Sequence, residues 1–446
     1  MKILVTHDFL STKLLIHTPR LSNFLSPILN YLKCEHTFLS KEQAEKLEEN
    51  LNIKRTGKMF TYVTESDLSN TATKHIVNFL KQYDVIIIFE ATKTLKSLLN
   101  KNGITYIDIW LSPFRFSKDM MFSIASNDPL VQEKLDGYKI NKEELLKHAN
   151  IVKGHANNFL THQEIILEKN SALLIGQLFQ DKSVMKDGKF LTLLDFKDKL
   201  KELATNYNKI YFLKHPLMSQ DDFSEILDGL SDITNIIYIT KINTYYLLSQ
   251  PEICDVIGLS SSVLIEAEYF HKKSIYLFRP ILGPEFKTIY KNIYKTKFWK
   301  EILKINSNQN DIEYLVHDNY MRYSTGLYYG YSNFMNDFPD KREYKTITNL
   351  YRFCTELDRN KKYILYGYGS LGKLILPLIK ESVTAIIDGA LTQNTYIEGI
   401  PTIPIDELPP SSDVIITPYI YAEEIIPKLK EKECNYILPN RILAAE

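Results

Sequence analysis

Short apolar runs alternate with longer amphipathic stretches along most of this chain. In the first part, continuous apolar runs rich in β-branched residues occur at residues 2–7, 84–90 and 104–111. Such runs are typical of strands that are buried on both faces of a parallel sheet. The stretch 92–102 between two of them has the three- and four-residue apolar spacing of a helix. This alternation predicts a doubly wound α/β domain.

Two further series of the same kind follow. The second series contains predicted strands and helices, with strands at 172–177, 209–216, 236–240, 255–261 and 274–280 and helices at 196–208 and 262–273. The third series begins with a strand and helix at 361–380 and continues with strands at 383–389, 413–418 and 434–439. Between these two series, residues 311–357 are rich in tyrosine and have a helical pattern without a clear strand.

The three series predict an α/β protein of GT-B type, with two facing Rossmann-like domains and a small C-terminal Rossmann-like domain. The expected divisions are an N-terminal acceptor and catalytic domain, a nucleotide-sugar-binding domain, a helical linker and the small domain, at 1–170, 171–310, 311–360 and 361–446. Two such domains around a cleft suggest a glycosyltransferase by analogy of architecture.

Composition excludes several classes of protein. Lys plus Arg and Asp plus Glu are both 54, so the net charge is zero and a broad nucleic-acid surface is not expected. The four cysteines lie far apart in sequence, which indicates reduced thiols and no CxxC metal pair, and we expect no metal site. No run of 18 apolar residues predicts a membrane span, and the first residues are too polar for a signal peptide. We therefore expect a cytoplasmic protein, with a peripheral contact to the inner membrane or to an assembly complex as an open alternative. The Lys-rich, aromatic stretch 286–300 is expected either to contact a membrane surface or to form a solvated amphipathic helix.

Three polar clusters follow predicted strands of the second series. They are "GQLFQDKS" at 176–183, "KHP" at 214–216 and "GLSSS" at 258–262. Ligands of open parallel sheets bind beyond the carboxyl ends of the strands, so these clusters are expected to form one site.

Each cluster has a physical role in such a site. Lys214 and His215 are placed to hold a nucleotide phosphate, and Pro216 ends the strand because its φ is locked. The serines open a helix and either receive a phosphate or only cap the helix. Glu266, one turn later, either accepts hydrogen bonds from ribose hydroxyls or is a solvated helix residue.

The ordered set resembles the bacterial β-Kdo transferases of capsule and O-antigen synthesis over residues 80–285. It is also similar to other CMP-sugar transferases with His-Pro and Ser-Ser motifs, including bacterial sialyltransferases, although only those two elements match the latter. "IDIWLSPFRFSKDMMFSIASN" at 107–127 adds to the Kdo-transferase likeness, whereas Phe179-Gln180 and the missing second proline after "KHP" depart from it. The resemblance implies a CMP-Kdo donor, a saccharide or glycolipid acceptor, no required cofactor and retention of configuration.

Carried over by motif, Asp181 matches the nucleophile and Asp108 an acidic group of the first domain, with Glu90 as a further candidate acid. Arg115 suits the carboxylate of a keto-sugar donor because a guanidinium binds it bidentately, unless Arg115 forms a structural salt bridge. Asp181 alternatively only caps the turn that follows it or pairs with Lys182 or Lys214. The expected substrate-binding residues are Arg115, Asn127, Gln177, Lys214, His215, Ser260, Ser261, Ser262 and Glu266.

The C-terminal series carries "GYGSLG" between a strand and a helix, which is the context of a dinucleotide fingerprint. Its candidate cofactor-binding residues are Gly367, Gly369, Gly372 and Asp388. About 86 residues remain there, with no partner domain for a hydride acceptor. A nucleotide-binding role and a structural or interaction role both stay open.

Three functions are compatible with these patterns. The main hypothesis is a retaining transferase that moves Kdo or a related keto sugar from CMP-Kdo to a saccharide in surface polysaccharide synthesis. The second is an inverting, sialyltransferase-like CMP-nonulosonate transferase, in which Asp108 or Glu90 is the base and Asp181 is structural. The third is a non-catalytic nucleotide-binding scaffold of a polysaccharide assembly complex.

Overall fold

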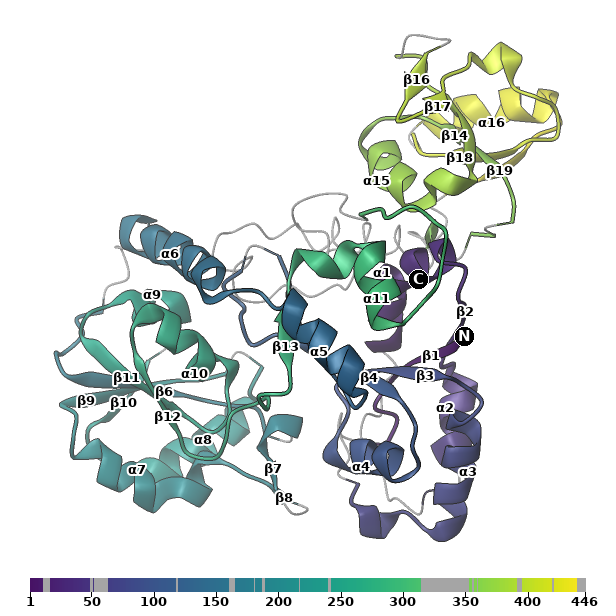
Figure 1. The fold of residues 1–446 in the computed structure, drawn as a ribbon. Helices are drawn as coiled ribbons and strands as arrows, with labels where there is room; N and C mark the ends of the chain where they lie inside the picture. The colour runs from purple at the N-terminus through teal and green to yellow at the C-terminus, as the bar shows by residue number, and fades with distance from the viewer. Residues whose placement is uncertain are drawn as a thin grey trace.

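The computed structural model describes most of the chain. The described residues are 1–10, 17–48, 51, 63–117, 119–159, 165–179, 181–186, 189–215, 217–239, 242–313, 353–354, 357–358, 360–390, 395–418 and 421–438. They form three larger sheets with helices around them, as Figure 1 shows. The predicted α/β class with parallel sheets is confirmed, and we call each large sheet with its own helices a unit.

The first sheet has the strand order β13-β5-β4-β3-β1-β2. Strands β1 to β4 pair in parallel, whereas β5 runs antiparallel to β4 and β13 antiparallel to β5. The strands are β1 (Lys2–His7), β2 (Glu35–Phe38), β3 (Val85–Phe89), β4 (Tyr106–Leu111), β5 (Phe122–Ser126) and β13 (Lys287–Ile289). The helices among them are α1 (His17–Tyr31), α2 (Lys41–Glu48), α3 (Asn70–Leu80), α4 (Lys93–Lys101) and α5 (Pro129–Tyr138). The apolar runs of β1, β3 and β4 form strands because both of their faces are buried.

The second sheet is fully parallel, with the order β10-β9-β6-β11-β12. Its strands are β6 (Ser171–Ile175), β9 (Lys209–Leu213), β10 (Ile236–Ile239), β11 (Ile253–Gly258) and β12 (Lys273–Tyr276). Its helices are α6 (Lys142–Phe159), α7 (Lys197–Ala204), α8 (Gln220–Leu230), α9 (Thr244–Ser249) and α10 (Ser262–Ala267). The chain goes from β6 outward through β9 to β10 and then returns to β11 on the other side, so the strand order reverses between β6 and β11.

The third sheet is parallel with the order β15-β14-β18-β19. Its elements are β14 (Tyr363–Tyr366), α15 (Ser370–Ile379), β15 (Val383–Ile387), β18 (Asp413–Ile416), α16 (Ala422–Glu431) and β19 (Asn435–Ile437). A small hairpin of β16 (Tyr396–Ile397) and β17 (Ile400–Pro401) lies between β15 and β18. The predicted helical linker 311–360 lies almost entirely outside the described residues.

Two segments cross the expected domain divisions. Helix α6 precedes residue 170, yet its buried Leu145, Ala149 and Val152 belong to the apolar cluster of the second unit. Strand β13 lies within 171–310 but completes the edge of the first sheet, and α11 (Thr296–Ile302) packs with that sheet's helices. The divisions at 170 and 310 stay a prediction. Helix α6 packs with the second unit, and the segment of β13 and α11 packs with the first, because their apolar faces are buried there.

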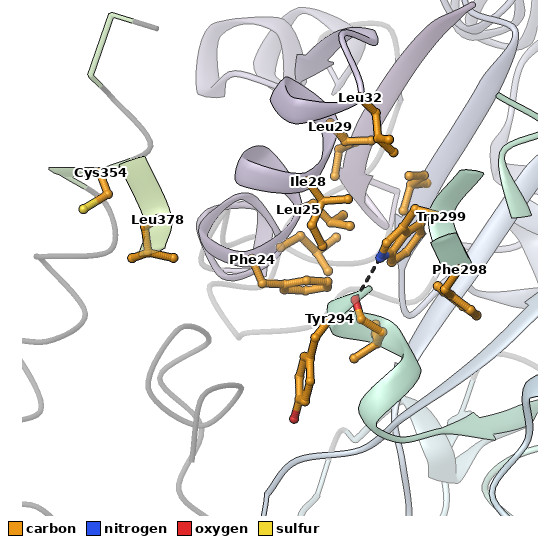
Figure 2. Close-up of a cluster of buried hydrophobic side chains, with 14 of the residues drawn as sticks. Phe24, Leu25, Ile28, Leu29, Leu32, Tyr294, Phe298, Trp299, Cys354 and Leu378 are labelled. Atoms are coloured by element: carbon orange, nitrogen blue, oxygen red, sulfur yellow. Dashed lines mark hydrogen bonds between the residues drawn. The ribbon is translucent and has the colours of Figure 1, made fainter. Parts of the chain in front are cut away.

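One apolar cluster joins the first unit to the third. Figure 2 shows Phe24 and Leu25 of α1 beside Trp299 of α11, whose indole Nε1 donates a hydrogen bond to the Ile293 carbonyl at 2.9 Å. The same cluster continues to Cys354 and to Leu378 of α15. Burial of Trp299 and its aromatic neighbours removes them from the surface, so the stretch 286–300 does not offer them for the membrane contact that its pattern suggested. None of the helices in the described part of the chain is long and apolar enough to cross a membrane.

We predict that the third unit needs a glycine at position 372 of its glycine-rich motif for full stability. A Cβ atom on Gly372 would clash with the Gly367 carbonyl oxygen, where α15 approaches the end of β14. Gly372→Ala should therefore lower the stability of this unit by about 1–3 kcal/mol, as overpacking does. Gly389→Ala is the matched control, since a Cβ atom at that position would have nothing within 4 Å. Hydrogen exchange of the β14 amides measures the difference, and equal protection in both variants would contradict the prediction.

Candidate active site

The polar clusters of the second unit meet where its strand order reverses. Gln177 directly follows the end of β6, and Ser260 follows β11. The Ser260 backbone amide donates to Gln177 Oε1 at 3.1 Å, and Ser260 Oγ donates to the Ser183 carbonyl at 3.0 Å. Gln177 Nε2 in turn donates to Ser183 Oγ at 2.5 Å. The "GQ", "DKS" and "GLSSS" segments are thus joined in one buried network at the switch point, the usual ligand position of an open α/β sheet.

Asp181 belongs to the same network as a capping group. Its Oδ1 accepts hydrogen bonds from the Ser183 amide at 2.8 Å and from Ser183 Oγ at 2.6 Å. These bonds cap the short 3-10 helix η2 (Lys182–Val184). The carboxylate is half-buried, and the nucleophilic role remains a prediction that has to compete with this capping role.

His215 stands beside the end of β6 because Gly176 allows two strands to come close. The Gly176 amide donates to the Leu213 carbonyl at 2.8 Å. A Cβ atom on Gly176 would lie 3.0 Å from both that carbonyl oxygen and the backbone nitrogen of His215. Burial lowers the pKa of His215 below its usual value, although the nearby Asp181 opposes this. The His215 Nδ1 accepts from the Leu217 amide at 3.1 Å, so the proton of the neutral ring is on Nε2.

The remaining residues of these two clusters are placed differently. The Lys214 ammonium donates to Gln220 Oε1 at 3.2 Å and lies 5.4 Å from the centre of the Phe223 ring, so it is directed toward α8. Ser261 caps α10 by accepting from the Val263 amide at 3.3 Å, and Ser262 begins that helix. The helix expected over 262–273 ends at Ala267 and continues only as a 3-10 turn to Phe270.

The Glu266 side chain is buried between α10 and the loop that carries Arg115. It is 1% exposed, and its Oε1 accepts from the backbone amides of Arg115 at 2.6 Å and Phe116 at 3.0 Å. The expectation of a solvated helix residue is therefore wrong, because the loop of the first unit covers this face of α10. The ribose-binding role stays a prediction, with Oε1 already bound to donors of the protein itself. Arg115 is half-buried, and its charge favours the ionised form of Glu266.

Glu90 lies where the first and second units touch. It directly follows β3, and its amide donates to the Ile109 carbonyl at 2.9 Å. Its φ is 55°, a left-handed conformation that costs free energy in a residue other than glycine. The Glu90 carbonyl accepts from Lys182 Nζ at 3.0 Å, which connects the end of β3 to η2 of the second unit. A strained, half-buried carboxylic acid thus stands at the junction of the two units, and we use "junction" below for this region.

Asp108 lies on β4 with no exposed surface. It accepts from the Ala91 amide at 2.9 Å and from Trp110 Nε1 at 3.1 Å, and it forms an ion pair with Lys96 at 3.6 Å. Burial raises the pKa of Asp108 to about 7, and the positive charge of Lys96 opposes this only in part. Both carboxylate oxygens therefore already have partners inside the protein.

Sequence reasoning missed Asp8, which is also fully buried beside this group. Its two oxygens accept from the Leu10 amide at 3.0 Å and the Thr92 amide at 2.6 Å, so it connects the loops after β1 and β3. A signal was present, since Asp8 follows the first apolar run at the carboxyl end of a parallel strand.

Asn127 does not lie with the other candidates. It follows β5, which is antiparallel to β4, so it emerges at the edge of the sheet where β4 begins. Its Oδ1 accepts from the Tyr106 amide at 2.9 Å, and its Nδ2 donates to the Ile104 carbonyl at 2.9 Å. The prediction that Asn127 lines the same pocket as Arg115 is wrong, because the antiparallel course of β5 places Asn127 at the opposite edge of the sheet from the loop that carries Arg115.

The glycine-rich motif of the third unit has the expected strand-loop-helix context. Gly367 has a φ of 96°, and Gly369 caps α15. Asp388 accepts from the Tyr368 amide at 2.6 Å and from the Ala390 amide at 2.8 Å, so its carboxylate supports the loop. Nucleotide binding by this motif stays a prediction. In the described part of the chain, no group of three or more His, Cys, Asp or Glu side chains could hold a metal ion.

Two α/β units meet at this junction, with a polar network at the switch point of the second one, which is the arrangement expected of a GT-B-type fold. The sequence profile of the alpha-2,8-polysialyltransferase (POLYST) family matches residues 29–279, and the chain belongs to that family. The protein is therefore a CMP-sugar-dependent glycosyltransferase. This membership favours the sialyltransferase-like hypothesis over transfer of Kdo, and it leaves the non-catalytic scaffold without support.

Solved structures that match part of this chain come from two groups of proteins. The KpsC β-Kdo 2,7 transferase of Thermosulfurimonas dismutans is 13% identical, with a TM-score of 0.34 over 63% of this chain and 80% of that one. The UDP-GlcNAc 2-epimerase of Neisseria meningitidis is 12% identical, with a TM-score of 0.23 over 61% of this chain and 81% of that one. No curated protein matches the sequence.

We predict that Asp108 makes the stability of the first unit fall as the pH rises toward 7. Its pKa of about 7 lies above the usual value of 3.8, so the folded protein keeps a proton that the unfolded chain has lost between these values. Unfolding then releases this proton, and the free energy of unfolding decreases by about 1.4 kcal/mol per pH unit from this group. Asp108→Asn should remove that contribution between pH 5 and 7.

Urea unfolding followed by tryptophan fluorescence measures this slope. Both tryptophans of the chain report on the first unit, because Trp110 lies in β4 of its sheet and Trp299 of α11 belongs to its apolar cluster. Asp232→Asn is the control, because its bonds to Lys201 and Lys197 lower the pKa of Asp232 to about 2 and keep it ionised throughout this range. An Asp108→Asn variant with the wild-type slope would show that Asp108 is ionised in the folded protein.

Proposed function

We propose that the protein transfers a nonulosonic acid of the sialic acid type from its CMP donor to a saccharide acceptor, with inversion of configuration. The observation that carries this proposal is the hydrogen-bonded network of Gln177, Ser183 and Ser260 at the switch point, inside the residues that match the polysialyltransferase family. The acceptor is a polysaccharide, as the family implies, and the reaction belongs to the synthesis of a surface polysaccharide.

The donor nucleotide is assigned to the second unit. Here the end of β9 supplies His215, and the segment after β11 supplies Ser261 and Ser262. The neutral His215 ring carries its proton on Nε2, so it donates a hydrogen bond to a phosphate oxygen without needing a positive charge. Each serine hydroxyl is a further donor for the same anion. Arg115 is the group for the carboxylate of the sugar, since a guanidinium and a carboxylate form two parallel hydrogen bonds.

The general base is assigned to Glu90. Inversion needs a single base, which takes the proton of the acceptor hydroxyl while the oxygen of that hydroxyl bonds to the anomeric carbon. At the same time, the bond from that carbon to the CMP phosphate oxygen breaks, and CMP leaves with the electron pair. Asp108 suits this task less well than Glu90, because it is fully buried and both of its oxygens already accept hydrogen bonds. Strain at Glu90 supports the assignment, since such conformations concentrate at functional sites.

Retaining transfer of Kdo requires a different use of the same residues. Asp181 would have to attack the anomeric carbon, but its Oδ1 accepts two hydrogen bonds from Ser183 and caps η2. Its role in the inverting reaction is structural, which agrees with these contacts.

We predict that Glu90→Gln lowers kcat by about 100-fold or more, as expected for loss of a general base. The donor KM should change only a few-fold, because the amide keeps the shape of the side chain. Wild-type protein and variant are compared with CMP-sialic acid, CMP-Kdo, UDP-sugars and GDP-sugars, and NMR gives the anomeric configuration of the product. Glu35→Gln, an exposed position on β2, is the control. Retained configuration, or turnover with UDP- or GDP-sugars alone, would overturn the proposed function.

We also predict that His215→Ala weakens CMP binding about tenfold or more, since a hydrogen bond to a charged group contributes about 1.5–3 kcal/mol. Stability should change little, because the ring is only partly covered and its single assigned bond is to the Leu217 amide. Calorimetric titration with CMP measures the affinity, and His75→Ala on the exposed face of α3 is the control. Equal CMP affinity in all three proteins would show that His215 only terminates its strand.

A further inference from the structure

The loop between β4 and β5 leaves the first unit and inserts into the second. Its Phe114 ring lies 5.2 Å from the Tyr269 ring, and its Phe116 ring lies 6.1 Å from that of Phe270. Phe114 and Phe116 are buried members of the apolar cluster that otherwise comes mainly from the second unit, including its helix α6. The loop is therefore anchored to the second unit, although the strands on both sides of it belong to the first sheet.

Glu266 ties the backbone of this loop to α10. Its Oε1 accepts from the Arg115 amide at 2.6 Å, from the Phe116 amide at 3.0 Å and from Tyr245 Oη at 2.9 Å. The three donors come from the loop of the first unit and from α9, and Glu266 itself is 1% exposed. An ionised acceptor makes such bonds shorter and stronger than a neutral one does.

The same short helix that carries Glu266 begins at Ser262 and is capped by Ser261. The serines and the attachment point of Arg115 are therefore only one helical turn apart on a rigid element. A displacement of α10 would therefore move the serines and Arg115 together, because the Arg115 amide is hydrogen-bonded to Glu266.

We propose that Glu266 is a positioning residue of the donor site, which holds Arg115 at a set distance from the serine segment so that the sugar carboxylate and the phosphate are bound together. This inference rests on the proposed function, because it gives Arg115 a keto-sugar acid as its ligand. Glu266 itself touches no substrate in this arrangement. Its contribution is specific to donors that carry a carboxylate, and it is absent for CMP alone.

The charges around Glu266 add a pH dependence to this role. Burial raises the pKa of Glu266 to about 7, while the hydrogen bonds of the loop amides and of Tyr245, together with the Arg115 charge, oppose the shift. The groups that face it are thus Arg115 from the loop and Tyr245 from α9. Protonation of Glu266 as the pH falls below 7 weakens its bonds to the loop, so the donor KM should rise in that range.

The test compares Glu266→Gln with wild type by donor kinetics and by calorimetry with CMP. The donor KM of the variant should rise about tenfold or more at pH 8, with kcat changed less than about threefold and CMP affinity unchanged. The rise of the wild-type KM below pH 7 should be absent from the variant. Glu268→Gln, an exposed neighbour on the following 3-10 turn, is the matched control.

Two further variants keep the inference testable if Glu266→Gln does not fold. Tyr245→Phe removes one of the three donors to Oε1 and should raise the donor KM in the same direction by a smaller factor. Arg115→Ala should reproduce the KM effect, and its combination with Glu266→Gln should add little, because both act on one contact. Equal losses of affinity for CMP and for the full donor, or an unchanged donor KM in these variants, would overturn the inference.

Failure of the proposed function gives a different result. If the wild-type protein uses CMP-Kdo and not CMP-sialic acid, the choice of donor is wrong, but Glu266 is tested equally well with CMP-Kdo because that sugar also carries a carboxylate. If the wild-type protein transfers only sugars without a carboxylate, both the proposed function and the role of Glu266 are overturned.

Discussion

The hydrogen bonds between Gln177 and Ser260 connect the carboxyl ends of two strands at the point where the strand order of the second sheet reverses. The rest of the junction depends on this connection. Gln177 also binds Ser183, which orients η2, and η2 carries Lys182 to the carbonyl of Glu90 in the first unit. A single buried amide side chain thus connects the switch point of the second unit to the strained Glu90 of the first unit. A buried polar network costs free energy unless each of its groups has a hydrogen-bond partner. Because the arrangement that provides these partners is favoured over others, the geometry of the network is well defined.

Two carboxylic acids in buried positions raise the question of how the molecule tolerates them. Asp108 and Glu266 both have pKa values of about 7, and in both the loss of solvation is the largest cause. Each is surrounded by backbone amides and one aromatic side-chain donor, with a single basic residue nearby. Backbone amides do not move away as long side chains do, so these acids serve as cross-links between loops. Asp108 connects the segment after β3 to β4, and Glu266 connects the first unit to the second.

Much of the fold could be predicted because parallel strands buried on both faces have continuous apolar sequences, as in β3 and β6. The meeting of the polar clusters was also predictable, since carboxyl ends of parallel strands share one edge of a sheet. The position of Asn127 at the other edge of the first sheet was not predictable, because nothing in its local sequence shows that β5 runs antiparallel to β4. The contact of Glu266 with Arg115 joins residues 151 apart in sequence and depends on how two units pack, which local sequence patterns do not show. Asp8 was visible at a strand end but lacked a neighbouring motif to draw attention to it.

The return of β13 to the first sheet has a consequence for the order in which the protein folds during synthesis. The ribosome releases β1 to β5 first, but β5 lacks its outer neighbour until residues 287–289 have emerged, after the whole second sheet has been made. During that interval β5 has an open edge with unpaired backbone groups, which is a template for association with other nascent chains. The second sheet can close earlier, since β6 to β12 are contiguous in sequence. Translation speed between β5 and β13 therefore sets how long this edge stays open on each new chain.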